Sequence, residues 1–139
     1  MSDAARATTL ETLAAGGRHV LLGVLGGIFS EGVDLPGDGL LAAIIVGLGL
    51  PGLDLERKLL QDWYETRYGE GYRYAWLVPG LARVVQAAGR VIRTPTDRGA
   101  IVLLDRRFLQ YEIQAFFPPD WTPQRVRDPA AALVAFWSG

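Results

Sequence analysis

Three arginines and one glutamine are spaced so that a helix would bring them onto one face. At about 100° per residue, Gln86, Arg90 and Arg93 fall within about 60° of one another, and Arg83 lies beside them. The apolar residues of this segment fall on the opposite face, which predicts that they pack against a sheet. The planar guanidinium group matches the oxygens of a phosphate. The face could therefore bind phosphate, or it could be a solvated surface whose arginines pair with acids; the spacing alone is compatible with both.

A glycine-rich loop carries a second set of polar side chains. Residues 26–37 follow the apolar run 19–25, and ligands of parallel α/β sheets bind at the carboxyl ends of the strands. The loop residues that could take part in such a site are Ser30, Glu31, Gly32 and Asp34. The two carboxylates could contact a ribose hydroxyl or a metal-bound water. Alternatively, the loop is a turn whose acids cap backbone amides.

Short apolar runs alternate with helical patterns along the chain and would hold these two sets in place. We expect buried strands at 19–25, 42–48 and 100–104, and an extended piece at 75–78. Helices are expected at 8–15, 54–68, 79–92, 108–116 and 128–137. This alternation predicts an α/β fold with a mostly parallel sheet flanked by helices. Three strands make a small sheet, so one edge is expected to be exposed or paired with something else.

The composition narrows the classes of function. The 139 residues carry a net charge of −1, so binding to nucleic acid through charge alone is not expected. The chain has no cysteine, which excludes disulfides and iron–sulfur ligation by this chain. The longest apolar stretch, 40–53, is interrupted by Gly and Pro and is shorter than the roughly 20 residues that span a bilayer. We therefore expect a soluble, cytoplasmic protein without a membrane partner.

Several short motifs in a fixed order resemble those of one enzyme family. Residues 30–34 (SEGVD) resemble motif V of XPD/DinG-like superfamily 2 helicases, and residues 86–93 (QAAGRVIR) resemble their motif VI. Further similar segments lie at 44–51, 97–108 and 118–121, so the resemblance covers roughly residues 10–123. It implies a RecA-like domain of the P-loop NTPase type at 19–123, incomplete at its N-terminal side. A helical segment at 1–18 precedes it, and a tail at 124–139 follows.

The resemblance also implies a function. The chain would be the second motor domain of an ATP-dependent 5′–3′ DNA helicase, with single-stranded or forked DNA as its substrate. Arg93 and Arg90 would contact the γ-phosphate as arginine fingers, and Gln86 would position the attacking water or the phosphate. The motif V residues expected near the nucleotide, where they couple it to DNA, are Ser30, Glu31, Gly32 and Asp34. ATP and Mg²⁺ would be held mainly by the first helicase half, in the same polypeptide or another.

This sequence departs from a complete helicase. It contains no G-x-x-x-x-G-K-[ST] motif, its only lysine is Lys58, and no DEAH-like acidic motif is present. We therefore expect that the chain alone does not hydrolyse ATP. It would be a fragment of a longer enzyme, the product of a split gene, or a remnant. In the last case the alternative function is a non-catalytic module that binds DNA or protein.

Three other patterns could belong to a ligand-binding or catalytic site, but each favours a structural explanation. Residues 47–52 match G-x-G-x-x-G, but no strand ending in an acid follows at the distance that dinucleotide binding requires. Asp105 ends an apolar run as in a Walker B site, yet without a P-loop a structural carboxylate near Arg106 or Arg107 is favoured. The aromatic residues of 63–76 could stack on bases, but core packing or domain docking is the commoner use.

Overall fold

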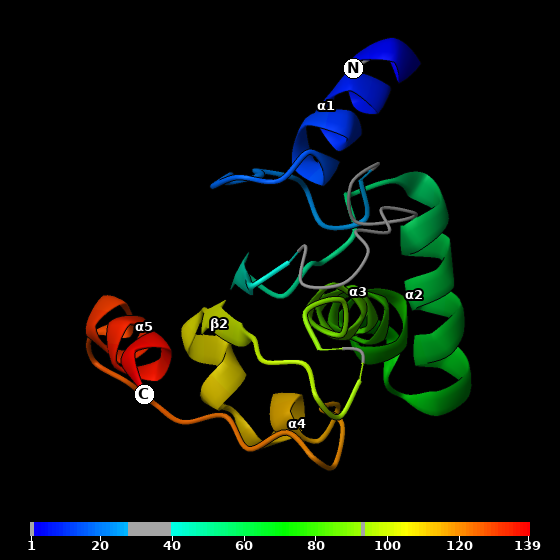
Figure 1. Cartoon of the computed structure of the whole chain (residues 1–139). Coiled ribbons are helices and arrows are strands. Elements are labelled where there is room, and N and C mark those ends of the chain that lie inside the picture. The colour runs from blue at the N-terminus through cyan, green and yellow to red at the C-terminus, as the bar shows by residue number, and fades with distance from the viewer. Residues whose placement is uncertain (1, 28–39, 93) are drawn as a thin grey trace.

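The computed structural model describes residues 2–27, 40–92 and 94–139 (Figure 1). Helices dominate these residues, and two strands lie among them. The elements, in chain order, are α1 (Asp3–Ala14), β1 (Ala42–Val46), α2 (Leu55–Tyr68), the π-helix η1 (Arg73–Leu77), α3 (Val78–Ala88), β2 (Ala100–Leu104), the 3₁₀ helix η2 (Arg106–Leu109), α4 (Tyr111–Gln114) and α5 (Pro129–Ser138).

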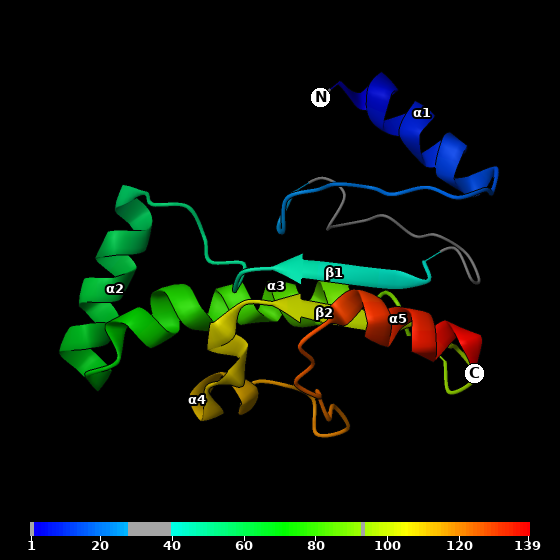
Figure 2. The ribbon, with the colours of Figure 1, turned by 90° about the vertical axis from the view of Figure 1, so that its left-hand side faces the viewer.

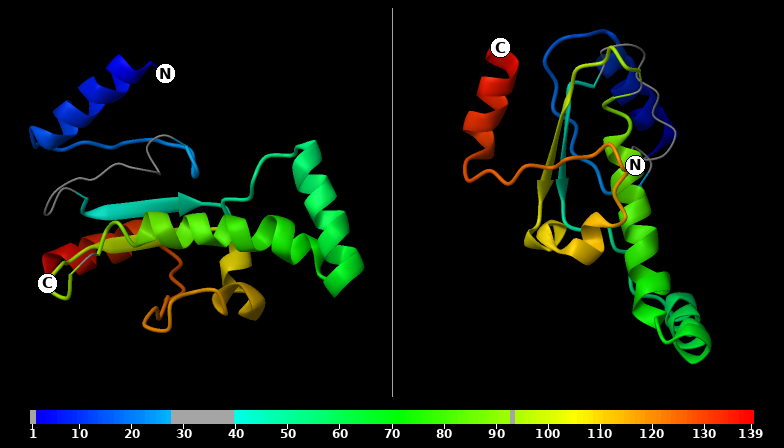
Figure 3. Two further views of the ribbon diagram at one scale, coloured as in Figure 1. Left: turned by 90° about the vertical axis from the view of Figure 1, so that its right-hand side faces the viewer. Right: turned by 90° about the horizontal axis from the view of Figure 1, so that it is seen from below.

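The two strands form a parallel sheet that is connected through helices. Ala42 lies opposite Ala100 and Val46 opposite Leu104, so the strands are in register over their whole length. The chain leaves β1, passes through α2, η1 and α3, and returns to β2, as the parallel direction of two strands requires. Figure 3 shows α3 on one side of the two strands and α5 on the other. This arrangement confirms the predicted α/β class and is consistent with a partial RecA-like domain.

The core lies between the sheet and α3. Leu81 and Val84 of α3 have the largest fully buried side chains among the described residues, and they pack with Ile45 of β1. Phe108 and Ile113 close the core from the C-terminal side. Each such side chain contributes roughly 1.5–3 kcal/mol through the apolar surface that it removes from water. The apolar face predicted for the arginine-bearing helix therefore does pack on the sheet.

Capping residues account for the helix boundaries that the sequence predicts best. The Asp54 carboxylate accepts from the Arg57 N–H at 2.6 Å and begins α2, and Gly69 ends that helix in the left-handed region at φ 70°. The Asp128 carboxylate accepts from the Ala131 N–H at 3.0 Å and begins α5. Both helices occur where the sequence predicts them.

The segment predicted to be extended at 75–78 is helical, and that prediction is wrong. Residues 73–77 form the π-helix η1, which continues directly into α3. Ala75 and Trp76 are buried there, and the indole N–H of Trp76 donates to the side-chain oxygen of Gln61 at 2.8 Å. Packing of Trp76 against α2 thus decides the conformation of a stretch whose own pattern is too short to do so.

The apolar run at 19–25 is not a strand, which corrects a second prediction. It passes along β1 without joining the sheet, and Val20, Leu22 and Val24 are 80–89% exposed (Figure 2). Of this run, Leu25 packs against the core. A strand that is buried on both faces needs neighbouring strands. No strand of the described part of the chain pairs with this run, so its apolar side chains are not buried as its sequence predicts.

Other boundaries differ in smaller ways. Helix α1 begins at Asp3, earlier than the predicted 8–15, because the Ser2 hydroxyl accepts from the Ala5 N–H at 3.3 Å. The helix predicted at 108–116 is divided into η2 and the four-residue α4. Among the residues that the structure describes, no helix has both the length and the apolar character needed to cross a membrane.

Candidate phosphate-binding site

Helix α3 carries two of the residues predicted for the arginine face, Arg83 and Gln86. Pro79 lies near the start of α3, where the π-helix η1 passes directly into the α-helix. Because Leu81 and Val84 point into the core, Arg83 and Gln86 project from the other side of the helix. Gln86 is exposed and Arg83 is half-buried. The sequence therefore predicted correctly which face of this helix is polar.

The helix ends earlier than predicted, at Ala88 instead of near residue 92. Gly89 is its C-cap, and Arg90 lies in the following turn, where its N–H donates to the Ala87 carbonyl at 3.4 Å. The Arg90 side chain is half-buried and lines a cleft between residues 21–25 and β1. Arg90 thus remains on the side of α3 that faces the 21–25 segment, although it is not part of the helix.

Five of the predicted site residues lie outside the described residues. They are Arg93 and the motif V residues Ser30, Glu31, Gly32 and Asp34. Their roles stay predictions.

Arg83 contacts the chain that leads into the motif V loop, a contact that sequence spacing did not suggest. A Cβ on Gly26, whose φ is +78°, would lie 2.9 Å from the guanidinium carbon of Arg83. The same guanidinium donates to the Gly49 carbonyl at 3.5 Å, a long hydrogen bond. Arg83, on the polar face of α3, therefore lies against Gly26 at the end of the segment 19–25.

Two glycines bring α3 close to the end of β1. A Cβ on Gly49 would lie 2.9 Å from the Gly80 carbonyl oxygen, and a Cβ on Gly80 would lie 2.7 Å from the Leu48 carbonyl oxygen. Gly49 also has a φ of +64°, which favours glycine. The G-x-G-x-x-G pattern of 47–52 is thus used for packing between a helix and a strand end. This contact disfavours the dinucleotide interpretation.

The carboxylate at the end of β2 is held by an arginine. Arg107 contacts Asp105 with its guanidinium group, at 2.7 Å from Nη2 to Oδ2 and 3.0 Å from Nε to Oδ1, and its backbone N–H donates to Oδ1 at 2.8 Å. These hydrogen bonds lower the pKa of Asp105 below its ordinary value of 3.8, and the same pair raises the pKa of Arg107. The structural interpretation of Asp105 is confirmed, which removes the resemblance to a Walker B carboxylate.

A prediction about acid stability follows from this pair. We expect Asp105→Asn to lower the free energy of unfolding by about 1 kcal/mol at neutral pH, because the amide lacks the negative charge that pairs with Arg107 and keeps only one acceptor oxygen. Since folding lowers the pKa of Asp105, its contribution is present above the pKa of the unfolded chain and is lost as pH falls through the folded value. Urea unfolding of both proteins should therefore give a constant difference down to about pH 5 that shrinks below about pH 4. A difference that persists undiminished at about pH 2.5 would contradict the assignment.

The aromatic residues of 63–76 mostly contact one another. Tyr64 stacks on Tyr74 with ring centroids 5.2 Å apart, and Trp63 meets Tyr64 edge-on at 5.0 Å. The Arg67 guanidinium lies over the Trp63 ring at 5.6 Å. These contacts, together with the buried Trp76, account for the cluster by packing between α2 and η1.

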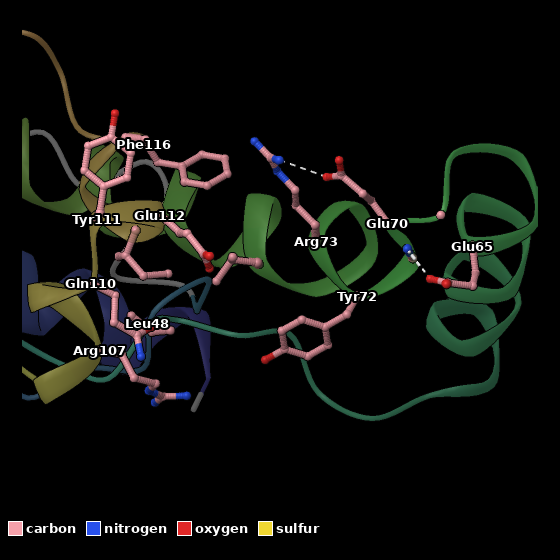
Figure 4. Close-up of a pocket in the computed structure, with 15 residues that line it drawn as sticks. Leu48, Glu65, Glu70, Tyr72, Arg73, Arg107, Gln110, Tyr111, Glu112 and Phe116 are labelled. Atoms are coloured by element: carbon pink, nitrogen blue, oxygen red, sulfur yellow. Dashed lines mark hydrogen bonds and ion pairs between the residues drawn. The ribbon is translucent and has the colours of Figure 1, made fainter.

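A hollow of about 610 Å³ lies between the end of α2, η1 and residues 107–116 (Figure 4). Four of its charged lining residues, Glu65, Glu70, Arg73 and Arg107, are engaged within the protein. Arg73 pairs with Glu70 at 2.9 Å, the Glu65 carboxylate accepts from the Gly71 N–H at 2.7 Å, and Arg107 is held by Asp105. The hollow therefore offers a ligand fewer available charges than its residue types suggest. We place the candidate site at the arginine-bearing face that includes Arg83 and Arg90.

Comparisons with known proteins agree with the motif order. Residues 1–124 match the family model described as the helicase C-terminal domain. The chain is 32% identical over 124 residues to the ATP-dependent DNA helicase DDX11 of Mus musculus, covering 84% of this chain and 14% of that protein. It is 36% identical over 85 residues to the ATP-dependent DNA helicase DinG of Photobacterium profundum, covering 60% of this chain and 12% of that protein.

A third relative, the regulator of telomere elongation helicase 1 homolog of Aedes aegypti, is 41% identical over 95 residues, which cover 64% of this chain and 9% of that protein. The chain thus spans a small fraction of the length of the helicases that it matches. The family match extends over nearly the whole chain, and the parallel sheet with its crossover helices is consistent with it. The chain belongs to the helicase C-terminal domain family of the XPD/DinG-like superfamily 2 helicases.

Proposed function

We propose that this chain is the second motor domain of an ATP-dependent 5′–3′ DNA helicase and completes an ATP site whose other side belongs to a first helicase half. In this proposal Arg90 and Arg93 contact the γ-phosphate, and Gln86 positions the attacking water or the phosphate. The loop residues that couple the nucleotide to single-stranded or forked DNA are Ser30, Glu31, Gly32 and Asp34.

One observation on the described residues supports the proposal. The polar side of α3 faces the segment that leads into the motif V loop, through the contact of Arg83 with Gly26 and the position of Arg90 in the cleft beside residues 21–25. In the family both motifs border the nucleotide, so they have to lie on one side of the domain. The positions of Gly26, Arg83 and Arg90 support that arrangement.

The arginines of the described part of the site fit a phosphate. Guanidinium groups stabilise the charge that develops on the phosphoryl oxygens during transfer, and arginine fingers contribute on the order of 10³–10⁵ in rate. Asp105 is occupied by Arg107, and the described residues bring no three acidic or histidine side chains together for a metal ion. We therefore assign the Mg²⁺ that accompanies ATP mainly to the first half.

The first test uses the chain without that half. We expect no ATP hydrolysis above background, with or without single-stranded DNA, because the sequence lacks the P-loop that grips the phosphates. Phosphate release measures this directly, and turnover by the purified chain alone would contradict the proposal.

The second test adds a first half that carries the P-loop lysine, either in trans or fused to this chain. We expect DNA-stimulated phosphate release that saturates with the concentration of the added chain. If the chain binds DNA but never stimulates the first half, the alternative of a non-catalytic remnant replaces the proposal.

A further inference from the structure

The hollow of about 610 Å³ beside η1 carries an excess of negative charge (Figure 4). Its two arginines, Arg73 and Arg107, are each paired with an acid. The Glu65 carboxylate accepts from the N–H of Gly71, a neutral donor that leaves the charge of the carboxylate in place. The Glu112 carboxylate has no hydrogen-bond or ion-pair partner among the described residues. Two carboxylates that line the hollow are therefore available to a cationic group.

The rest of the lining suits the aliphatic part of a long basic side chain. Leu48 and Ile113, each 3% exposed, form buried parts of the wall. Tyr72 and Tyr111, which are 51% and 87% exposed, add aromatic surface that reaches solvent. An arginine or lysine lays its methylene groups on apolar surface of this kind and keeps its charged end with a carboxylate. The hollow is therefore suited to a basic segment of polypeptide.

The segment that precedes α5 carries a complementary pair of charges. Arg125 and Arg127 are exposed, and Val126 between them is 46% exposed. Neither arginine has a hydrogen-bond or ion-pair partner within the part of the chain that the structure describes. Residues 122–126 belong to no helix or strand, so their backbone groups are not committed to a regular element. The segment thus offers two guanidinium groups to an acidic surface.

This segment does not lie in the hollow of its own chain. Arg125 and Val126 line a different cavity, which runs beside β2 and η2. Trp121 packs against the core before the segment begins. After the segment, Arg98 lies over the Phe136 ring of α5 at 4.8 Å and connects that helix to the start of β2. Because the segment is anchored at both ends, its arginines are available to another molecule.

We propose that the hollow of one copy of this chain receives residues 124–127 of a second copy. The guanidinium groups of Arg125 and Arg127 would pair with the two available carboxylates, and their methylene groups would lie on the apolar lining. A second copy is favoured over an unrelated partner because the chain itself carries both complementary surfaces. Two copies related by a two-fold axis make this contact twice, which closes the assembly as a dimer. The inference is independent of the proposed ATP chemistry.

The experiment follows the oligomeric state of the 139-residue chain by sedimentation velocity from micromolar to millimolar concentration. We expect a reversible dimer whose Kd rises at least about tenfold between about 0.1 M and 0.5 M salt, because ion pairs hold the contact. Glu112→Arg and Arg127→Glu each place like charges opposite one another, so each variant should dimerise at least about tenfold more weakly. Both positions are exposed, and circular dichroism checks that the fold is kept. Lys58→Glu, which changes the net charge as Arg127→Glu does but lies on α2 outside the hollow, should dimerise normally.

Mixing the two reversed variants separates this contact from a general effect of charge. The reversed hollow of Glu112→Arg then meets the reversed segment of Arg127→Glu, and the two unchanged surfaces meet each other. We expect the mixture to dimerise about as tightly as the wild-type chain. A wild-type chain that stays monomeric throughout, a mixture no tighter than either variant alone, or an equal loss with Lys58→Glu would overturn the proposal. A monomer whose hollow binds the acetylated peptide Gln-Arg-Val-Arg in an NMR titration would also overturn it, because the occupant would then belong to another polypeptide.

Discussion

Replacing Arg93 by alanine is expected to lower DNA-stimulated ATP hydrolysis at least roughly 10³-fold in an enzyme that contains this chain together with its P-loop half. The guanidinium of an arginine finger stabilises the negative charge that develops on the phosphoryl oxygens in the transition state. It binds the ground-state substrate less strongly. The loss should therefore appear mainly in kcat, with a smaller change in KM for ATP. Arg90→Ala is expected to give a loss of the same kind. Steady-state phosphate release over a range of ATP and DNA concentrations measures both parameters.

The matched control removes an arginine on another element. Arg67 of α2 lies over the Trp63 and Tyr68 rings at 5.6 and 6.0 Å, so Arg67→Ala changes the net charge by the same amount at a different place. We expect that variant to keep nearly its full rate. A lysine at position 93 should remain far below the wild-type rate, since an ammonium group cannot bind a phosphate through two parallel hydrogen bonds. A near-normal rate for Arg93→Ala would remove this residue from the site.

Substituting Gly80 by alanine should destabilise the fold, although alanine is the better helix former by about 1 kcal/mol. The new Cβ would lie 2.7 Å from the Leu48 carbonyl oxygen and 3.1 Å from the Leu50 N, and both are backbone atoms that cannot rotate away. Overpacking of this kind costs about 1–3 kcal/mol. We expect the Tm of the chain to fall by about 5–10 °C in a thermal melt followed by circular dichroism.

Gly52 provides the comparison for this substitution. A Cβ at Gly52 would meet no atom within 4 Å, and its φ lies outside the left-handed region. Gly52→Ala should therefore leave Tm unchanged or raise it slightly, because alanine restricts the unfolded chain. If Gly80→Ala melted no lower than Gly52→Ala, the close approach of α3 to the end of β1 would be wrong.

The sequence predicts an element well when its signal is local. The apolar runs of β1 and β2 are bounded by glycine or polar residues, and Asp54 and Asp128 cap their helices directly. The failures depend on contacts between distant residues. The run 19–25 looks like a buried strand because it is apolar, but burial needs a neighbouring strand that the described residues do not supply. The π-helix η1 depends on the bond from Trp76 to Gln61, 15 residues away in the chain.

The same distinction applies to the candidate site. Helical spacing was enough to place Arg83 and Gln86 on one side of α3. It could not show that Gly89 ends the helix, or that Arg83 contacts Gly26. The resemblance to motifs V and VI adds what spacing cannot, and the family match supports it. The roles of Arg93 and of residues 30–34 remain predictions.

Photo-crosslinking from the nucleotide itself tests the central claim most directly. An ATP analogue with an azidoanilide on the γ-phosphate is bound to a first half carrying the P-loop lysine, mixed with this chain and irradiated, and the labelled peptides are identified by mass spectrometry. The account predicts label on residues 86–93 of this chain, lost when the P-loop lysine of the other half is replaced. Label confined to the first half, at concentrations of this chain that saturate the ATPase, would contradict a shared phosphate site.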